Sequence, residues 1–234
     1  MVKVLELFSG TGSIGRVCMN RGFDVVSLDM IQDADIKIDI MLWDYKSTYK
    51  PGYFDIITAS PVCTYWSKLR NCHIGRGMTK ESIQYDIDTI GKPMVDKVRE
   101  IIDYFKPKYY WIENPQTGKM KSYITDLQYY DVDYCKYGFS YMKRTRFWTN
   151  IKGFEPKICK KDCGSIIPNT KRHIKTLGNG YGRDNEGNII LINTKAKRLK
   201  YKNSIKDIKE TTTKIERYRI PEQLINDLLD LVFF

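Results

Sequence analysis

Short hydrophobic runs alternate with amphipathic stretches through the first half of the chain. Four runs predict buried strands, because each is apolar and ends in a small or polar residue. They cover residues 2–8, 24–29, 54–59 and 108–114. Between them, residues 13–22 and 92–105 carry apolar side chains at helical spacing, which predicts helices. Strands and helices alternating at these lengths predict an α/β fold: a doubly wound, mostly parallel, Rossmann-like sheet with helices on both faces.

The pattern changes after residue 150. Residues 151–213 are rich in Lys, Arg, Asn and Gly, have weak periodicity, and contain a turn-rich stretch at 178–188 followed by one clear strand at 188–192. Helical spacing returns after Pro221. We therefore expect an α/β domain over 1–150, a small basic lobe over 151–213, and a C-terminal segment over 214–234 whose helix packs back on the first domain.

Charge and composition narrow the class of protein. A chain of 234 residues supports one sizeable core, and its formal net charge of +11 favours a polyanionic partner such as nucleic acid, although a merely basic protein fits the charge equally well. Because we find no signal peptide and no run long enough to span a bilayer, we expect an intracellular protein without membrane contact. The six cysteines are then expected to be reduced thiols.

A glycine-rich turn follows the first predicted strand. Gly10, Gly12 and Gly15 are spaced as G-x-G-x-x-G between that strand and a helix. Asp29 ends the second strand, where a carboxylate can accept hydrogen bonds from ribose hydroxyls, and Asp39 ends a third strand that we predict in IKIDI. A tight turn also uses glycine for structural reasons alone, but the combination favours a nucleoside-containing cofactor.

Four segments in this order together carry a family resemblance. They are LFSGTGSIG (7–15), SPVCTYWS (60–67), WIENP (111–115) and YGFSYMKRTRFWTN (137–150). The combination resembles the cytosine-C5 DNA methyltransferases, in the short form found in phages and large DNA viruses. The resemblance covers about residues 3–150 and, faintly, the C-terminal helix. It implies S-adenosylmethionine as cofactor and a flipped cytosine of duplex DNA as substrate.

The resemblance also implies roles for individual residues. Cys63 would be the thiolate that adds to C6 of cytosine, and Glu113 would hold a proton at N3. Arg146 and Arg144 would contact the base or a nearby phosphate. The cofactor pocket would be formed by residues on the strand ends, namely Phe8, Gly10, Thr11, Gly12, Asp29, Asp39 and Pro61.

The chain departs from the family pattern at several positions. Val62 replaces a second proline, Thr64 follows the cysteine where glutamine is common, and ENP and KRTR replace the usual forms of their elements. Two other functions therefore stay open. One is an RNA cytosine-C5 methyltransferase on the same scaffold, and the other is a noncatalytic nucleic-acid-binding protein that retains the fold.

The basic lobe corresponds to the region that recognises the target sequence in the family. Its basic residues are Lys157, Lys160, Lys161, Lys171, Arg172, Lys195, Lys197, Arg198 and Lys200. Lysines mainly contact phosphate, so we expect a short or relaxed recognition sequence. Cys159, Cys163 and His173 form C-x3-C-x9-H, but a structural zinc site needs four ligands. Cys72 and His73 could approach in space, and the sequence alone assigns no metal.

Overall fold

The computed structural model describes residues 1–31, 33–167, 171–177, 180–183, 189–192 and 210–232. The chain divides into two compact units. The main unit comprises Met1–Val132, Arg144–Pro156 and Glu222–Phe234, and the small unit comprises Asp133–Lys143 and Lys157–Pro221. The chain therefore passes between the units at other residues than 150 and 213, and each unit is built from separate segments.

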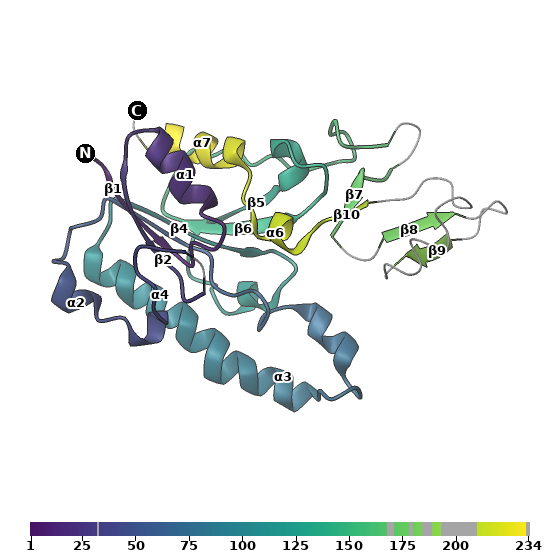
Figure 1. Ribbon diagram of the computed structural model, residues 1–234, viewed down its shortest axis with the longest axis horizontal. Coiled ribbons are helices and arrows are strands. Elements are labelled where there is room, and N and C mark those ends of the chain that lie inside the picture. The colour runs from purple at the N-terminus through teal and green to yellow at the C-terminus, as the bar shows by residue number, and fades with distance from the viewer. Residues whose placement is uncertain (32, 168–170, 178–179, 184–188, 193–209, 233–234) are drawn as a thin grey trace. The chain divides into compact units, whose positions relative to one another are not determined.

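A six-stranded sheet forms the centre of the main unit, with strand order β2-β1-β3-β4-β6-β5 (Figure 1). The strands are β1 (Lys3–Leu7), β2 (Asp24–Leu28), β3 (Ile56–Ala59), β4 (Tyr109–Pro115), β5 (Tyr129–Asp133) and β6 (Arg144–Thr149). The pairs β1–β2, β1–β3 and β3–β4 are parallel, and β4–β6 is antiparallel. The predicted α/β fold with a mostly parallel sheet is confirmed.

The described part of the main unit contains five α-helices, and helices cover both faces of the sheet (Figure 1). They are α1 (Ser13–Asn20), α2 (Tyr45–Thr48), α3 (Lys80–Asp86), α4 (Lys92–Phe105) and α7 (Glu222–Asp230). Figure 1 shows α1 and α7 on one face and α4 on the other. Arg21, just after α1, forms an ion pair with Asp230 at 2.7 Å and donates from Nε to Asn226 Oδ1 at 2.8 Å. These contacts fasten α7 to α1 within the main unit.

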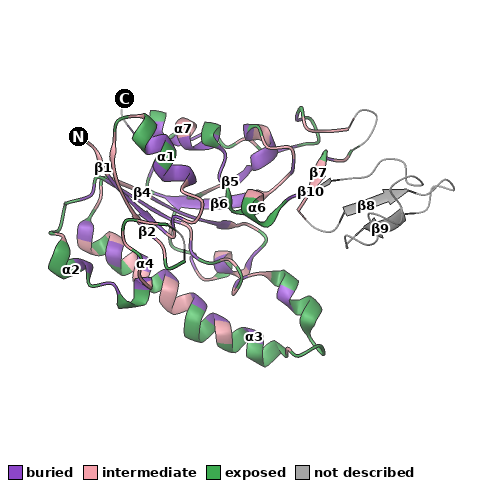
Figure 2. Cartoon of the chain, viewed as in Figure 1, coloured by how far each residue is buried: buried purple, intermediate pink, exposed green. Residues whose placement is uncertain are grey.

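The core of the main unit is a large apolar cluster along the strands and α4. Its largest fully buried side chains include Trp66, Phe54 and Phe105, and Figure 2 shows the buried residues concentrated on the strands and on the inner sides of the helices. No helix among the described residues is long and apolar enough to cross a membrane.

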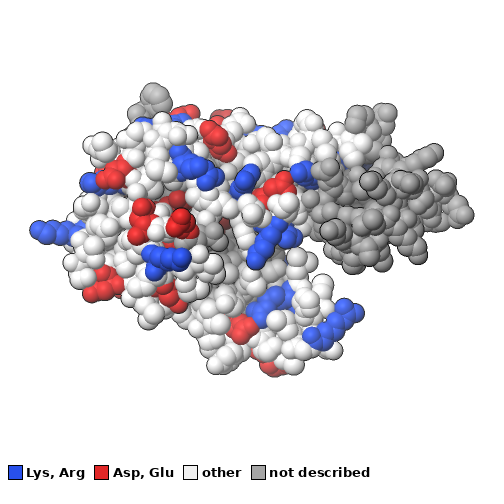
Figure 3. Space-filling model, viewed as in Figure 1, with Lys and Arg blue, Asp and Glu red and all other residues white. Residues whose placement is uncertain are grey.

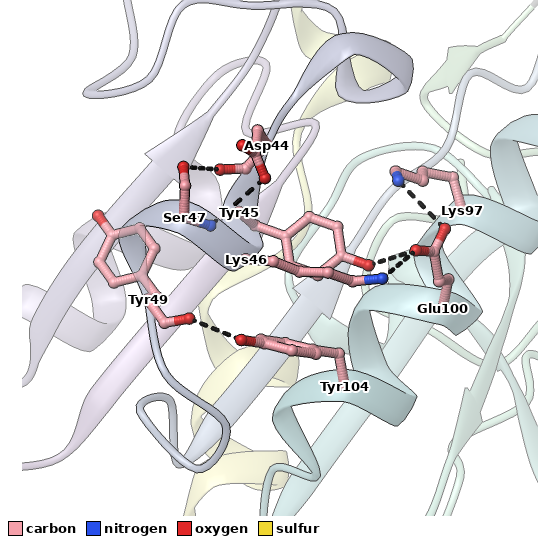
Figure 4. Close-up of polar contacts among 8 residues, drawn as sticks. All are labelled: Asp44, Tyr45, Lys46, Ser47, Tyr49, Lys97, Glu100 and Tyr104. Atoms are coloured by element: carbon pink, nitrogen blue, oxygen red, sulfur yellow. Dashed lines mark hydrogen bonds and ion pairs between the residues drawn. The ribbon is translucent and has the colours of Figure 1, made fainter.

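A polar cluster joins α2 to α4 at the edge of this core (Figure 4). The Tyr45 hydroxyl donates to Glu100 Oε1 at 2.6 Å, and the ammonium groups of Lys46 and Lys97 each lie 3.1 Å from a Glu100 oxygen. The hydrogen bond from Tyr45, with those from the two lysines, lowers the pKa of Glu100 to about 2. The carboxylate therefore stays ionised while it connects the two helices.

The segment IKIDI does not form the third strand that its apolar alternation suggests. Ile36 makes a single bridge to Leu28, and the chain then enters the short 3-10 helix η1 (Ile40–Leu42). Asp39 is the N-cap of η1, with its Oδ1 accepting a hydrogen bond from the Met41 amide at 2.9 Å. The prediction that Asp39 ends a strand was wrong, because an aspartate satisfies the exposed amides of a helical turn better than it continues a strand.

The small unit consists of short elements. They are η5 (Tyr134–Tyr137), β7 (Lys175–Thr176), β8 (Gly180–Arg183), β9 (Ile189–Ile192), β10 (Glu210–Thr211) and α6 (Lys214–Tyr218). Strands β8 and β9 are antiparallel, which confirms the strand predicted at 188–192 apart from Asn188, and β7 pairs with β10. Asn188 and four of the basic residues, Lys195, Lys197, Arg198 and Lys200, lie outside the described residues.

Candidate active site

Strand register aligns the loops that carry the predicted site residues. In the parallel part of the sheet Leu7 is opposite both Leu28 and Ala59, and Ala59 is opposite Ile112. The carboxyl ends of β2, β1, β3 and β4 therefore lie at one edge, where sheets of this kind bind ligands. The loops leaving this edge contain Asp29, the glycine-rich turn and Cys63, and Glu113 lies near the end of β4. Residues that are far apart in sequence thus converge through register.

The glycine-rich turn is held in a left-handed conformation by Asp29. Phe8, Gly10 and Gly12 have φ angles of 58°, 52° and 62°, and Gly12 is the residue from which α1 starts. Glycine adopts this region at little cost, whereas Phe8 is constrained there. The Gly10 amide donates to Asp29 Oδ2 at 2.9 Å, and Asp29 Oδ1 accepts from the Ile31 amide at 2.9 Å. Asp29 therefore orders the turn.

Glu6, which the sequence analysis did not single out, is a buried carboxyl group below this turn. Its side chain is 3% exposed and accepts hydrogen bonds from the Ile14 and Gly15 amides at 3.2 and 3.0 Å. Burial raises the pKa of Glu6 to about 7, against the opposing effect of the two backbone hydrogen bonds. A Cβ at Gly15 would lie 2.6 Å from Glu6 Oε2, which explains the third glycine of the motif. The signal in the sequence was a single charged residue inside the apolar run VLELF.

Trp66 anchors the loop that carries Cys63. Cys63 is half-buried, and its carbonyl accepts a hydrogen bond from the Trp66 amide at 3.1 Å. The Trp66 indole is 1% exposed and stacks on Tyr123 with ring centroids 5.7 Å apart. A Cβ at Gly91 would approach the indole to 3.2 Å, so this glycine makes room for it. The Lys119 amide donates to the Trp66 carbonyl at 2.8 Å, which fixes the far end of the loop.

A buried hydrogen bond connects the Cys63 loop to the end of β4. Asn114 Nδ2 donates to the carbonyl oxygen of Pro61 at 2.8 Å, and Asn114 is 1% exposed. Its neighbour Glu113 is 6% exposed. Asn114 Oδ1 is buried without a hydrogen-bond partner among the described residues. The asparagine of the ENP element therefore sets the spacing between the loop of the predicted nucleophile and the strand of the predicted acid.

The two arginines of KRTR lie on β6, antiparallel to β4. Arg146 is opposite Asn114, and Phe147 is opposite Glu113. Since directly opposed residues share a face of the sheet, Arg146 projects on the side of Asn114 and away from the side of Glu113. The Arg144 carbonyl accepts from the Gln116 amide at 3.1 Å, and its side chain is half-buried.

Asp131, on β5, holds the Arg146 guanidinium. Arg146 Nε and Nη2 lie 2.7 and 2.8 Å from the two Asp131 carboxylate oxygens, and the guanidinium carbon lies 3.5 Å from the centroid of the Tyr129 ring. The hydrogen bonds from Asp131 raise the pKa of Arg146 above its ordinary value. Neither Asp131 nor Tyr129 was predicted as part of the site, because β5 is too mixed in polarity to stand out in the sequence.

The predicted residues therefore fall into three groups. Most of them lie at one edge of the sheet, where Glu113 stands near the end of β4 and loops carry the others: Phe8, Gly10, Thr11, Gly12, Asp29, Pro61 and Cys63. Thr11 Oγ1 lies 2.9 Å from the Ser13 hydroxyl at the start of α1. Arg144 and Arg146 lie on the neighbouring antiparallel strand. Asp39 lies apart from both groups. It caps η1, and its carboxylate accepts a hydrogen bond from the backbone amide of Met41.

Comparison with known proteins identifies the family. No protein-family model matches the chain. The chain is 41% identical over 239 aligned positions to a Frog virus 3 protein named "Probable DNA (cytosine-5)-methyltransferase", with 98% of this chain and 100% of that protein covered. Its fold is similar to that of the Entamoeba histolytica methyltransferase EhMeth, with a TM-score of 0.53 at 13% identity over 100% of this chain and 98% of that structure. The predicted family is confirmed: the chain belongs to the DNA (cytosine-5)-methyltransferases.

Proposed function

We propose that the chain transfers a methyl group from S-adenosylmethionine to C5 of a cytosine flipped out of duplex DNA, through a covalent adduct on Cys63. The observation that carries the proposal is the buried hydrogen bond from Asn114 to the Pro61 carbonyl at 2.8 Å. It fastens the loop bearing a half-buried thiol to the strand end bearing a buried carboxyl group, at the edge of the sheet where ligands bind. Full-length similarity to the viral methyltransferase supports the same reaction.

The residue types suit the chemistry at a pyrimidine ring. The Cys63 thiolate forms a bond to C6, and the electron pair of the C5–C6 double bond moves into the ring, where a proton from Glu113 at N3 stabilises it. C5 would then take the methyl group as the bond between that group and the sulfonium sulfur breaks, which leaves S-adenosylhomocysteine. Loss of the C5 proton to a base returns an electron pair to the ring and expels the Cys63 thiolate, and return of the N3 proton to Glu113 regenerates the enzyme.

The cofactor site that we propose fits the observed turn. The Asp29 carboxylate accepts hydrogen bonds from the Gly10 and Ile31 amides, and because a carboxylate oxygen can accept more than one hydrogen bond, we propose that it also accepts one from a ribose hydroxyl. Gly10 and Gly12 carry no side chains of their own in this left-handed turn, which suits close approach of a ligand to its backbone. S-adenosylmethionine supplies the methyl group as a sulfonium. Phe8, Thr11, Pro61 and, as the outermost contact, Asp39 would complete the pocket.

Arg146 is proposed to act from a fixed position. Its bidentate pair with Asp131 and its stacking on Tyr129 restrain the side chain, and we propose that the restrained guanidinium contacts a base or phosphate oxygen. Asp131 is then a positioning residue. Arg144, half-buried two positions earlier on the same strand, is proposed as the second contact.

Nucleoside analysis tests the reaction and the nucleophile together. DNA and RNA of mixed sequence are incubated separately with the protein and labelled S-adenosylmethionine, and the modified nucleoside is identified. We expect 5-methylcytosine in DNA from the wild type and from Cys72→Ser, which removes an exposed thiol, and none from Cys63→Ser. A covalent complex should form on DNA containing 5-fluorocytosine.

The remaining outcomes distinguish the alternatives. Label in RNA but not DNA would favour an RNA methyltransferase. Tight DNA binding without label in either nucleic acid would favour a noncatalytic binder. An active Cys63→Ser variant would remove the covalent mechanism while leaving the activity.

We propose that the small unit recognises a short or relaxed DNA sequence. Among its described residues the basic side chains include Lys157, Lys160, Lys161, Lys171 and Arg172, which suit phosphate more than base edges. On the face shown in Figure 3, by contrast, basic and acidic groups are intermixed over the main unit. Each bidentate base contact gives about 1–3 kcal/mol of discrimination, and a small lobe supports few of them. Bisulfite sequencing of treated DNA should reveal methylation at sites of about two to four bases, and binding should weaken steeply with salt.

A further inference from the structure

Four metal-ligating side chains converge inside the small unit. Cys135, Cys159, Cys163 and His173 are all buried, and their ligand atoms all lie within 4.8 Å of one another. Neither Cys72 nor His73 belongs to this group, so the fourth ligand, missing from the local sequence pattern, is Cys135. We propose that these four residues bind a structural zinc ion.

The spacing of the ligand atoms suits a tetrahedral ion. With Zn–S near 2.3 Å and Zn–N near 2.1 Å, tetrahedral angles place sulfur and nitrogen about 3.6 Å apart and two sulfurs about 3.8 Å apart. Cys159 Sγ lies 3.5 Å from His173 Nε2. The remaining pairs, all within 4.8 Å, need shifts of no more than about 1 Å to close around an ion.

The backbone around Cys159 is arranged to stabilise a thiolate. The Lys161 amide donates to Cys159 Sγ at 3.3 Å, and Lys161 adopts a left-handed φ of 70°. The Cys159 amide is itself held by Asp133 Oδ2 at 2.8 Å, and Asp133 is fully buried. A hydrogen bond to sulfur favours its deprotonated form, which is the form that binds metal. The left-handed backbone of Lys161 thus directs its own amide toward the sulfur of Cys159, one of the four proposed metal ligands.

The donor set indicates zinc and a structural role. Three thiolates and an imidazole form the Cys3His set of structural zinc sites, whereas magnesium and calcium prefer oxygen ligands. Four protein ligands complete a tetrahedron and leave no position for a substrate or an activated water. The exposed fractions of the four residues lie between 5% and 9%, consistent with a closed site.

The ion would connect the two segments from which the small unit is built. Cys135 lies in η5, in the segment Asp133–Lys143, and the other three ligands lie in the segment that begins at Lys157. Between these segments the chain passes through the main unit as β6. Of the three cysteines' apolar neighbours, Met142 comes from the first segment and Ile166 from the second. A metal held by both segments would supply cohesion that this small cluster does not.

Metal analysis of the purified full-length protein tests the proposal without any assumption about catalysis. After dialysis into metal-free buffer, the wild type should retain about one zinc ion per chain, and a mercurial reagent should release it as the thiols react. Cys135→Ser and His173→Ala should each lower the zinc content severalfold or abolish it. Cys72→Ser, which removes an exposed cysteine of the main unit, should retain the wild-type content.

Cobalt exchange of the wild type adds a geometric readout that does not depend on any variant folding. Co²⁺ in place of zinc should give the intense visible bands of tetrahedral thiolate coordination. Zinc-free wild-type protein that also gives no such bands with Co²⁺ would overturn the proposal. So would a disulfide among Cys135, Cys159 and Cys163 in protein kept under reducing conditions, or a wild-type zinc content in Cys135→Ser.

Discussion

The interiors of the two units are packed from different kinds of side chain. In the main unit, a cluster of large apolar side chains that includes Trp66, Phe54 and Phe105 packs along the sheet. In the small unit, one buried cluster consists of Cys135, Cys159 and Cys163. Hydrophobic packing in the main unit positions loops through strand register, while the small unit combines buried tyrosines, Tyr134, Tyr137 and Tyr141, with this cluster of thiols. The proposed catalytic residues therefore lie on the unit with the larger hydrophobic core, and the proposed metal lies in the other unit.

Removal of the metal should produce the largest difference in stability between the two units. Structural zinc sites carry an apparent binding free energy on the order of 10 kcal/mol, so chelation should unfold the small unit and spare the main one. Hydrogen exchange measured by mass spectrometry should show lost protection in peptides covering residues 133–143 and 157–167, with β1 and α4 unchanged. Equal loss in both units would mean that the small unit has no separate metal-dependent stability.

Truncation of Trp66 should have the next largest effect, this time in the main unit. Trp66→Ala removes a fully buried indole and should lower the free energy of unfolding by about 3–5 kcal/mol. It should also reduce methyl transfer more than it reduces S-adenosylmethionine binding, because the indole anchors the Cys63 loop. Urea unfolding and calorimetry measure the two effects.

Trp66→Phe is the matched control. The indole nitrogen has no hydrogen-bond partner among the described residues, so phenylalanine loses volume but no bond. It should retain most of the stability and activity. Activity equal to wild type in Trp66→Ala would show that the loop is held by other contacts.

The buried Glu6 should make the main unit less stable as pH rises. Its pKa is raised from 4.5 to about 7 in the folded state, so between these values the folded protein keeps a proton that the unfolded chain has lost. The stabilisation is complete below pH 4.5 and declines through pH 7 by about 3 kcal/mol. Urea unfolding across this range should show the decline in the wild type and a flatter profile in Glu6→Gln.

Glu100 provides a control for this pH dependence of stability, because its pKa is shifted in the opposite direction from that of Glu6. Its pKa is lowered to about 2, so its contribution is present above pH 4.5 and is lost only as the pH falls toward 2. Glu100→Gln should therefore leave the slope between pH 5 and 7 unchanged. A wild-type profile in Glu6→Gln would assign the slope to another group.

Loss of Asp29 should weaken S-adenosylmethionine binding by about 1.5–3 kcal/mol, because Asp29→Ala removes the charged acceptor that we propose for a ribose hydroxyl and also the partner of the Gly10 amide. Calorimetry with the cofactor measures this. Asp35→Ala is the control, since Asp35 accepts from the Ser27 amide and hydroxyl at 2.9 and 2.6 Å without contacting the glycine turn. Equal affinity in the two variants would contradict the assignment.

Much of the main unit could be predicted because its signals are local. The four parallel strands and α4 follow from apolar runs and helical spacing, and the glycine turn and ENP element mark strand ends. Strands β5 and β6 were not predicted because their sequences, YYDVD and RTRFWT, mix aromatic, charged and polar residues without a clean apolar run. Asp39 was misplaced because the period-2 pattern of IKIDI does not reveal the competing cap.

Contacts between distant segments could not be predicted. Cys135 lies 24 positions before Cys159, on the far side of a strand that belongs to the other unit, so no ligand spacing points to it. Trp66 lies in a loop, and nothing in SPVCTYWS indicates that its indole is buried. Asp131 can hold Arg146 only because β5 and β6 are neighbours in the sheet, and the sequence does not reveal that pairing.

The discontinuous small unit limits how this methyltransferase can be recombined with its relatives. A hybrid enzyme made by exchanging only Lys157–Pro221 would import three candidate zinc ligands and leave Cys135 behind in the recipient. Successful grafting would require Asp133–Lys143 to travel with it, as two inserts flanking an unchanged β6. Natural exchange of this module by a single crossover would meet the same obstacle, so the two segments should be inherited together.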